Sequence, residues 1–170
     1  LGYCRIKLDD NGKPAFEYRL IPVDSRLDDR VDPAFSDIID AYAAEVKAKT
    51  DVKLGYSKYD ITRNTTKNRQ SRLGNLTADG LIWIAKRFFD VDADVSLYNS
   101  GGIRAEVSKG NVTLGDVYAV YPFDNALSLV TMKGRDIKTL FEHMAEEGGM
   151  PVNKAVKLVI KGKKVKSVTI

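Results

Sequence analysis

The chain has 170 residues, of which 44% are apolar, so it has the size of one globular domain or of one domain plus a piece of another. No stretch approaches the length of a membrane-spanning apolar helix, and the single cysteine, Cys4, excludes an internal disulfide and a cysteine metal cluster. The net charge of +4 mildly favours an anionic partner.

A hairpin and a helix are expected in the first part of the chain. Residues 3–8 and 15–23 read as strands around Asp-Asp-Asn-Gly-Lys, which is a hairpin turn signal. A charged loop follows, and Asp32-Pro33 is typical of a helix N-cap and its first helical position. The helix should run to about Thr50. Its apolar residues have helical spacing and predict one buried face, formed by Phe35, Ile38, Ile39, Tyr42 and Val46.

The rest of the chain mixes helices and strands, which predicts an α+β fold. In chain order, the pattern predicts a strand over 53–61, a helix over 73–90, a short helix over 113–119, a strand over 126–133, a helix over 137–147 and a closing hairpin of 155–161 and 164–170. Thr113 begins a capping-box-like sequence at the short helix. Trp83 is expected in the core, and His143, the only histidine, on the surface.

Lysines alternate with apolar residues in the closing hairpin, which indicates one solvated face. No aromatic residue is interleaved there to stack on bases, so no nucleic-acid partner is expected.

Residues 99–104, Asn-Ser-Gly-Gly-Ile-Arg, follow a strand-like run and have the chemistry of a ligand cradle. Gly101 and Gly102 can adopt positive φ and let a ligand approach the backbone. Asn99 can donate and accept hydrogen bonds, and Arg104 is a rigid cation suited to phosphate or carboxylate. Phe123 follows a proline and presents an aromatic ring. These groups predict a nucleotide cradle, although a Gly-Gly pair after a strand is also typical of a plain turn.

Four ordered motifs resemble the C-terminal domain of the 5'-nucleotidase family, which includes periplasmic UDP-sugar hydrolases and surface ecto-5'-nucleotidases. Residues 73–79 match L-G-N-L-x-x-D, residues 99–104 match N-[GS]-G-G-I-R, residues 112–117 form the threonine-led segment, and residues 122–127 match P-F-[GD]-N. The resemblance covers most of residues 50–147. It implies layered sheets and helices that form a nucleoside-binding domain, with a leading hairpin and a linker helix.

The resemblance also implies a role for the cradle residues. Phe123 would stack on the base, and Asn99 and Asn125 would bond the base edge or the sugar. Arg104 would hold the phosphate side, next to Gly101 and Gly102.

Bacterial family members carry two arginines, spaced i and i+4, ahead of the L-G-N-L motif, and both reach the substrate. In this chain they correspond to Arg63 and Lys67. Lys67 keeps the charge but loses the bidentate geometry of arginine, so Arg69 or Arg72 is an alternative second cation. Asn75 and Asp79 are expected to cap or brace the binding loops.

The resemblance divides the chain into three parts. Residues 1–23 would be the last strands of a preceding metallophosphatase domain, residues 24–50 a linker and hinge helix, and residues 51–170 a nucleoside-binding domain. The chain stops before the family's late N-F-x-x-x-G-G-D-G-[YF] segment, so this domain is expected to be incomplete. Two divalent metal ions and the catalytic Asp-His pair are expected in the N-terminal domain. No catalytic residue, metal or other cofactor is therefore expected in this chain.

The expected function is substrate binding in a metal-assisted nucleotide phosphohydrolase, with this chain inactive by itself. The expected partners are a nucleotide or nucleoside and the N-terminal metallophosphatase domain. Nucleoside monophosphates, UDP-sugars and 2',3'-cyclic nucleotides all remain open as substrates, and a non-catalytic binding module is the alternative. The family implies a periplasmic, secreted or cell-surface location, although no signal peptide opens the sequence.

Overall fold

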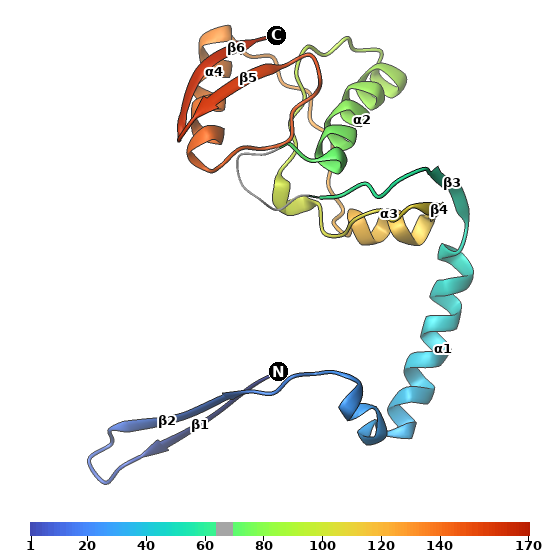
Figure 1. Ribbon diagram of the computed structural model, residues 1–170, viewed down its shortest axis with the longest axis vertical. Helices are drawn as coiled ribbons and strands as arrows, with labels where there is room; N and C mark the ends of the chain where they lie inside the picture. The colour runs from blue at the N-terminus through green and yellow to red at the C-terminus, as the bar shows by residue number, and fades with distance from the viewer. Residues whose placement is uncertain (64–69) are drawn as a thin grey trace. The chain divides into compact units, whose positions relative to one another are not determined.

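The computed structural model describes residues 1–63 and 70–170, which fall into two units, Leu1–Lys47 and Ala48–Ile170 (Figure 1). In these described ranges the strands form three separate two-stranded antiparallel sheets, and helices alternate with them along the chain. This mixture confirms the predicted α+β class. None of the described helices combines the length and the apolar character needed to cross a membrane.

The first unit begins with the predicted hairpin. Strands β1 (Gly2–Leu8) and β2 (Pro14–Leu20) pair antiparallel. Asp9 closes their turn, because its Oδ1 accepts the backbone N–H groups of Asn11 and Lys13 at 2.9 and 2.8 Å. A 3-10 helix, η1 (Ser25–Arg30), follows the hairpin.

Helix α1 (Pro33–Thr50) begins where the sequence predicts, with Asp32 Oδ1 accepting the Ala34 N–H at 3.0 Å. The expectation of a buried face is wrong, however. The five residues of the apolar stripe are 57–68% exposed. Periodicity shows which side of a helix is available for packing, and no described segment of the first unit covers this side.

In the second unit, one core cluster joins helix α2 (Arg72–Phe89) to a small sheet and a short helix. The sheet consists of β3 (Lys53–Ser57) and β4 (Gly110–Thr113), and α3 (Leu114–Val120) follows β4 directly. The capping box predicted at Thr113 is present. The buried side chains of this first cluster are Leu73, Ile103, Val107 and Val120.

A second core cluster lies between helix α4 (Gly134–Glu146) and the closing hairpin of β5 (Lys157–Lys161) and β6 (Lys164–Thr169), which Figure 1 shows side by side. Its fully buried members include Phe141 and Met144. The lysines of the hairpin are exposed, as predicted, and His143 is exposed near the end of α4.

Two further expectations are wrong. Residues 126–133 form no strand, because no described segment pairs with them, and Val130 is 74% exposed. Trp83 is 62% exposed rather than in the core. Its ring and that of Phe88 lie nearly perpendicular to each other, with their centroids 6.2 Å apart.

Candidate functional site

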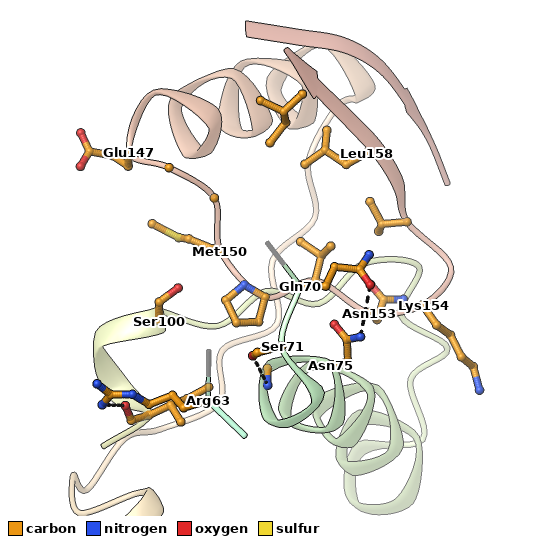
Figure 2. Close-up of a pocket in the computed structure, with 18 of the residues that line it drawn as sticks. Arg63, Gln70, Ser71, Asn75, Ser100, Glu147, Met150, Asn153, Lys154 and Leu158 are labelled. Atoms are coloured by element: carbon orange, nitrogen blue, oxygen red, sulfur yellow. Dashed lines mark hydrogen bonds between the residues drawn. The ribbon is translucent and has the colours of Figure 1, made fainter. Parts of the chain in front are cut away.

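A cavity of about 930 Å³ opens between the two core clusters of the second unit (Figure 2). Its walls are the first turn of α2, the glycine turn at η2 (Ser100–Gly102), and the segment 147–154 that leads to β5. Ile103 of the first cluster and Val156 of the second both line it. The cavity is therefore lined by apolar, polar and charged residues together.

The first turn of α2 is fixed by hydrogen bonds at the cavity wall. Ser71 caps the helix and its Oγ accepts the Gly74 N–H at 2.9 Å, while Asn75 Nδ2 donates to Gln70 Oε1 at 3.4 Å (Figure 2). Asp79 Oδ1 accepts the Lys154 N–H at 2.8 Å. Asp79 thus ties α2 to the opposite wall, which is the bracing role expected for it.

Two arginines line the cavity. Arg63 Nη1 donates to the Ile103 carbonyl at 2.8 Å, and its backbone N–H donates to Glu106 Oε1 at 2.8 Å. Arg104 is exposed, and its Nη1 reaches the Gly101 carbonyl at 3.5 Å. Within residues 1–63 and 70–170, neither guanidinium forms an ion pair with a carboxylate. Both therefore keep donors and positive charge for an anionic ligand.

The glycine turn requires glycine for a different reason from the one predicted from the sequence. Asn99 Oδ1 accepts the Gly101 N–H at 3.0 Å and caps η2. Neither Gly101 nor Gly102 has positive φ, so that conformational expectation is wrong. Gly102 is buried, and a Cβ there would lie 2.7 Å from Cε1 of Tyr98. The glycine is needed because an aromatic ring packs against its backbone.

The segment 121–125, here called the aromatic loop, lies next to Arg104 and does not form part of the cavity wall. Phe123 is 51% exposed, and Arg104 Cζ is 5.9 Å from its ring centroid. The Asn125 N–H donates to the Phe123 carbonyl at 2.9 Å, and Asn125 Nδ2 donates to Tyr98 Oη at 3.2 Å. Neither Phe123 nor Asn125 lines the cavity, so Arg104 is the residue that connects the cavity to the aromatic loop.

Of the three candidates for the second cation, the structure describes only Arg72. Lys67 and its alternative Arg69 lie outside the described residues. Arg72 donates to the Asp60 carbonyl at 3.3 Å, with its Cζ 5.5 Å from the centroid of the Tyr59 ring, and it does not line the cavity.

Several residues that organise the site were missed in the sequence. The Tyr98 and Tyr121 rings meet edge to face with their centroids 6.0 Å apart, and the Tyr121 hydroxyl lies 2.6 Å from Thr77 Oγ1 on α2. Burial raises the pKa of the Tyr121 hydroxyl above its usual range. Tyr98 directly precedes the Asn-Ser-Gly-Gly motif, and that position was the only signal.

Asn153 was also missed as an organising residue. It is buried, its Oδ1 accepts the Ser96 N–H at 2.9 Å, and its Nδ2 donates to the Asp94 carbonyl at 3.1 Å. Its amide therefore fixes the cavity wall to the segment before the glycine turn.

The described residues do not fit a metal centre, because no three His, Cys, Asp or Glu side chains among them could share one ion. The site is instead suited to binding. It combines two arginines that form no ion pair with a carboxylate in the described part of the chain, a partly exposed phenylalanine, and the amide groups of Asn99 and Asn125. Together with the α+β fold, this arrangement defines a domain suited to a ligand that has an anionic and an aromatic part.

The chain belongs to the family described as "5'-nucleotidase, C-terminal domain", whose family model matches residues 46–168. This confirms the family that the four sequence motifs indicated.

Similar proteins carry related names. The trifunctional nucleotide phosphoesterase protein YfkN of Bacillus subtilis is 32% identical over 88% of this chain and 10% of its own length. The 5'-nucleotidase of Mus musculus is 28% identical over 88% of this chain and 27% of its own length. The crystal structure of the 5'-nucleotidase precursor from Thermus thermophilus matches with a TM-score of 0.68 and 27% identity, over 98% of this chain and 35% of that one. The chain thus spans about a third or less of each of these relatives.

Proposed function

We propose that this chain is the nucleotide-binding part of a phosphohydrolase that cleaves phosphate esters. The observation that carries the proposal is the position of Arg104, which lines the cavity, as Arg63 does, and also approaches the ring of Phe123. One side chain thereby joins a cationic region to an aromatic one, and a nucleotide has the matching anionic and aromatic parts.

The phosphate side of the ligand would be held by arginines. Arg63 is held by its bond to Ile103, so its remaining N–H groups are oriented before a ligand arrives. Arg104 is a second arginine in the cavity lining. Charge-assisted bonds from such preoriented forks are the strong class of hydrogen bond to phosphate. The role of Lys67 as a third cation remains part of this proposal.

The base side would use Phe123. Stacking of a base on an aromatic side chain contributes roughly 1–3 kcal/mol and tolerates different bases. Asn125 is held beside Phe123 by the bond between its N–H and the Phe123 carbonyl. Asn99 uses its Oδ1 to cap the glycine turn, so its Nδ2 is the group we assign to the sugar or base edge. Gly101 and Gly102 shape that turn.

Catalysis would come from the N-terminal metallophosphatase domain that the family resemblance implies. Two metal ions there would activate water and neutralise charge on the phosphate. This chain would supply binding and orientation. Nucleoside monophosphates, UDP-sugars and 2',3'-cyclic nucleotides all carry the two parts that the site recognises. The family resemblance implies a periplasmic, secreted or cell-surface hydrolase, and that location is proposed with the function.

The test is an NMR-detected titration of this chain with adenosine and, separately, with ribose 5-phosphate. We expect adenosine to shift resonances at 121–125, and ribose 5-phosphate to shift those of Arg63 and Arg104. Phe123→Ala should abolish the adenosine shifts, whereas Phe89→Ala, which removes a phenylalanine of similar exposure (53% against 51%), should not. If neither ligand shifted any resonance, the proposal would be overturned.

A second pair of variants tests the cation. Arg104→Ala should weaken ribose 5-phosphate binding at least tenfold, because a charge-assisted bond to phosphate is worth about 1.5–3 kcal/mol. Arg87→Ala is the matched control, since Arg87 Cζ lies 5.8 Å from the Phe88 centroid in the same kind of exposed pair. Equal losses in both variants would show nonspecific attraction instead of a site.

A further inference from the structure

Tyr98 is the residue through which the glycine turn and the aromatic loop meet. Its ring lies against Gly102, where a Cβ would be 2.7 Å from the ring carbon Cε1. Its hydroxyl accepts the hydrogen bond from Asn125 Nδ2 at 3.2 Å. Both contacts are made by one half-buried side chain that lies at the edge of the first core cluster.

Tyr98 is itself held from several directions. Its backbone N–H donates to the Pro151 carbonyl at 3.1 Å, which anchors it to the cavity wall. Its ring packs edge to face on Tyr121, whose hydroxyl lies 2.6 Å from Thr77 Oγ1 on α2. Because helix, cavity wall and ring neighbour all restrain it, the Tyr98 hydroxyl occupies a defined position before any ligand binds.

Because Tyr98 is fixed, it also restrains Phe123, and Asn125 forms the link between the two residues. The Asn125 side chain is held by Tyr98, and its backbone N–H closes a tight turn onto the Phe123 carbonyl at 2.9 Å. The Phe123 ring is about half exposed, and the Arg104 guanidinium lies 5.9 Å from its centroid. Loss of the Tyr98 hydroxyl would therefore remove the side-chain hydrogen bond that restrains this turn, while the backbone bond of the turn would remain.

We infer that Tyr98 is a positioning residue for nucleoside binding, which orients Asn125 and, through it, Phe123 toward the base without touching the ligand. The inference rests on the proposed function, because it assigns Phe123 and Asn125 to the base. It predicts that Tyr98 controls affinity for the base side of a ligand and leaves the phosphate side unchanged.

The experiment measures dissociation constants of adenosine and of ribose 5-phosphate for wild type and Tyr98→Phe, using this chain. We expect adenosine to bind about fivefold more weakly to Tyr98→Phe, the effect of one net hydrogen bond, with ribose 5-phosphate unchanged. Tyr56→Phe is the matched control: it removes the hydroxyl of a tyrosine on β3 that is 62% exposed and does not line the cavity, and it should leave the affinity for both ligands unchanged. Thermal unfolding of each variant reports general loss of structure separately.

A double-mutant cycle with Asn125→Ala completes the test. If Tyr98 acts through Asn125, Tyr98→Phe has no further effect on adenosine affinity in the Asn125→Ala background. Equal adenosine affinity in wild type and Tyr98→Phe would overturn the inference and leave the proposed function standing. Additive losses in the cycle, or equal weakening of both ligands, would also overturn it. No adenosine binding by wild type would overturn the proposed function itself.

Discussion

Gly102 and Tyr98 form a backbone-to-ring contact with no space for a side chain between them, because a Cβ on Gly102 would lie 2.7 Å from one ring carbon and 2.8 Å from the hydroxyl. The ring is held by Tyr121 on one side and by its own backbone bond to Pro151. It therefore cannot move away without breaking those contacts.

Gly102→Ala is accordingly expected to destabilise the chain by about 1–3 kcal/mol, the range for overpacking a filled site. Gly80→Ala is the control. Gly80 lies inside α2 with nothing within 4 Å of an added Cβ, so alanine there should stabilise by up to ~1 kcal/mol through helix propensity. Urea denaturation of both variants measures the difference. Equal stability of Gly102→Ala and wild type would contradict the contact.

Tyr121→Phe removes a hydroxyl whose partner is Thr77 Oγ1, at 2.6 Å. Thr77 Oγ1 still donates to the Leu73 carbonyl at 2.7 Å, so we expect a loss of about 1 kcal/mol in the free energy of unfolding. The pKa of Tyr121 is raised by burial, and a raised pKa adds stability that is present below the reference value of 10.0 and lost as pH rises through the folded value. The stability gap between wild type and Tyr121→Phe should therefore narrow in alkaline solution, as measured by unfolding above pH 10.

Asp116→Asn should weaken the start of α3. Asp116 Oδ2 accepts the Thr113 N–H at 2.7 Å and the Thr113 hydroxyl at 2.9 Å, and these bonds lower the pKa of its carboxyl. A lowered pKa adds stability that is present above the reference value of 3.8 and lost as pH falls through the folded value. Wild type should therefore exceed Asp116→Asn in stability at neutral pH, and the difference should shrink below pH 3.8, as followed by circular dichroism. A gap that stays constant through this acid range would show that the capping carboxylate is not responsible.

Phe141→Ala should be the most damaging of these substitutions. Phe141 has no exposed surface and packs with Met144 and Val156 in the second core cluster. Truncation of a buried phenylalanine costs about 3–5 kcal/mol through lost burial and the cavity left behind. Phe89→Ala, at a site 53% exposed, should change the free energy of unfolding by less than about 1 kcal/mol. Similar losses in the two variants would mean that the second cluster does not stabilise the fold.

Local signals allowed most of the elements to be predicted. The turn at Asp9, the cap at Asp32 and the capping box at Thr113 each depend on residues a few positions apart, so the sequence contains the whole interaction. Burial was harder to predict. Trp83 is of a residue type that is usually buried, yet it is exposed. Whether one face of a helix is covered depends on segments that are far away in the chain.

The same distinction holds for the site. Arg104 and Phe123 were expected in one cradle, and the structure does place the guanidinium beside the ring. The contacts that hold this pair could not be predicted, because Tyr98 meets Asn125 across 27 positions and Thr77 meets Tyr121 across 44. Such pairs have no periodic or motif signature. Only the fold reveals them.

The cavity between the two core clusters has a consequence for the energetics of the second unit. The two clusters are built from different elements, and both Ile103 and Val156 line the space between them. A molecule that fills this space touches both clusters, so its binding energy opposes local opening of each. Amide hydrogen exchange at Val120 and at Phe141 would then slow together. Ligand binding would turn two neighbouring folding units into one cooperative unit.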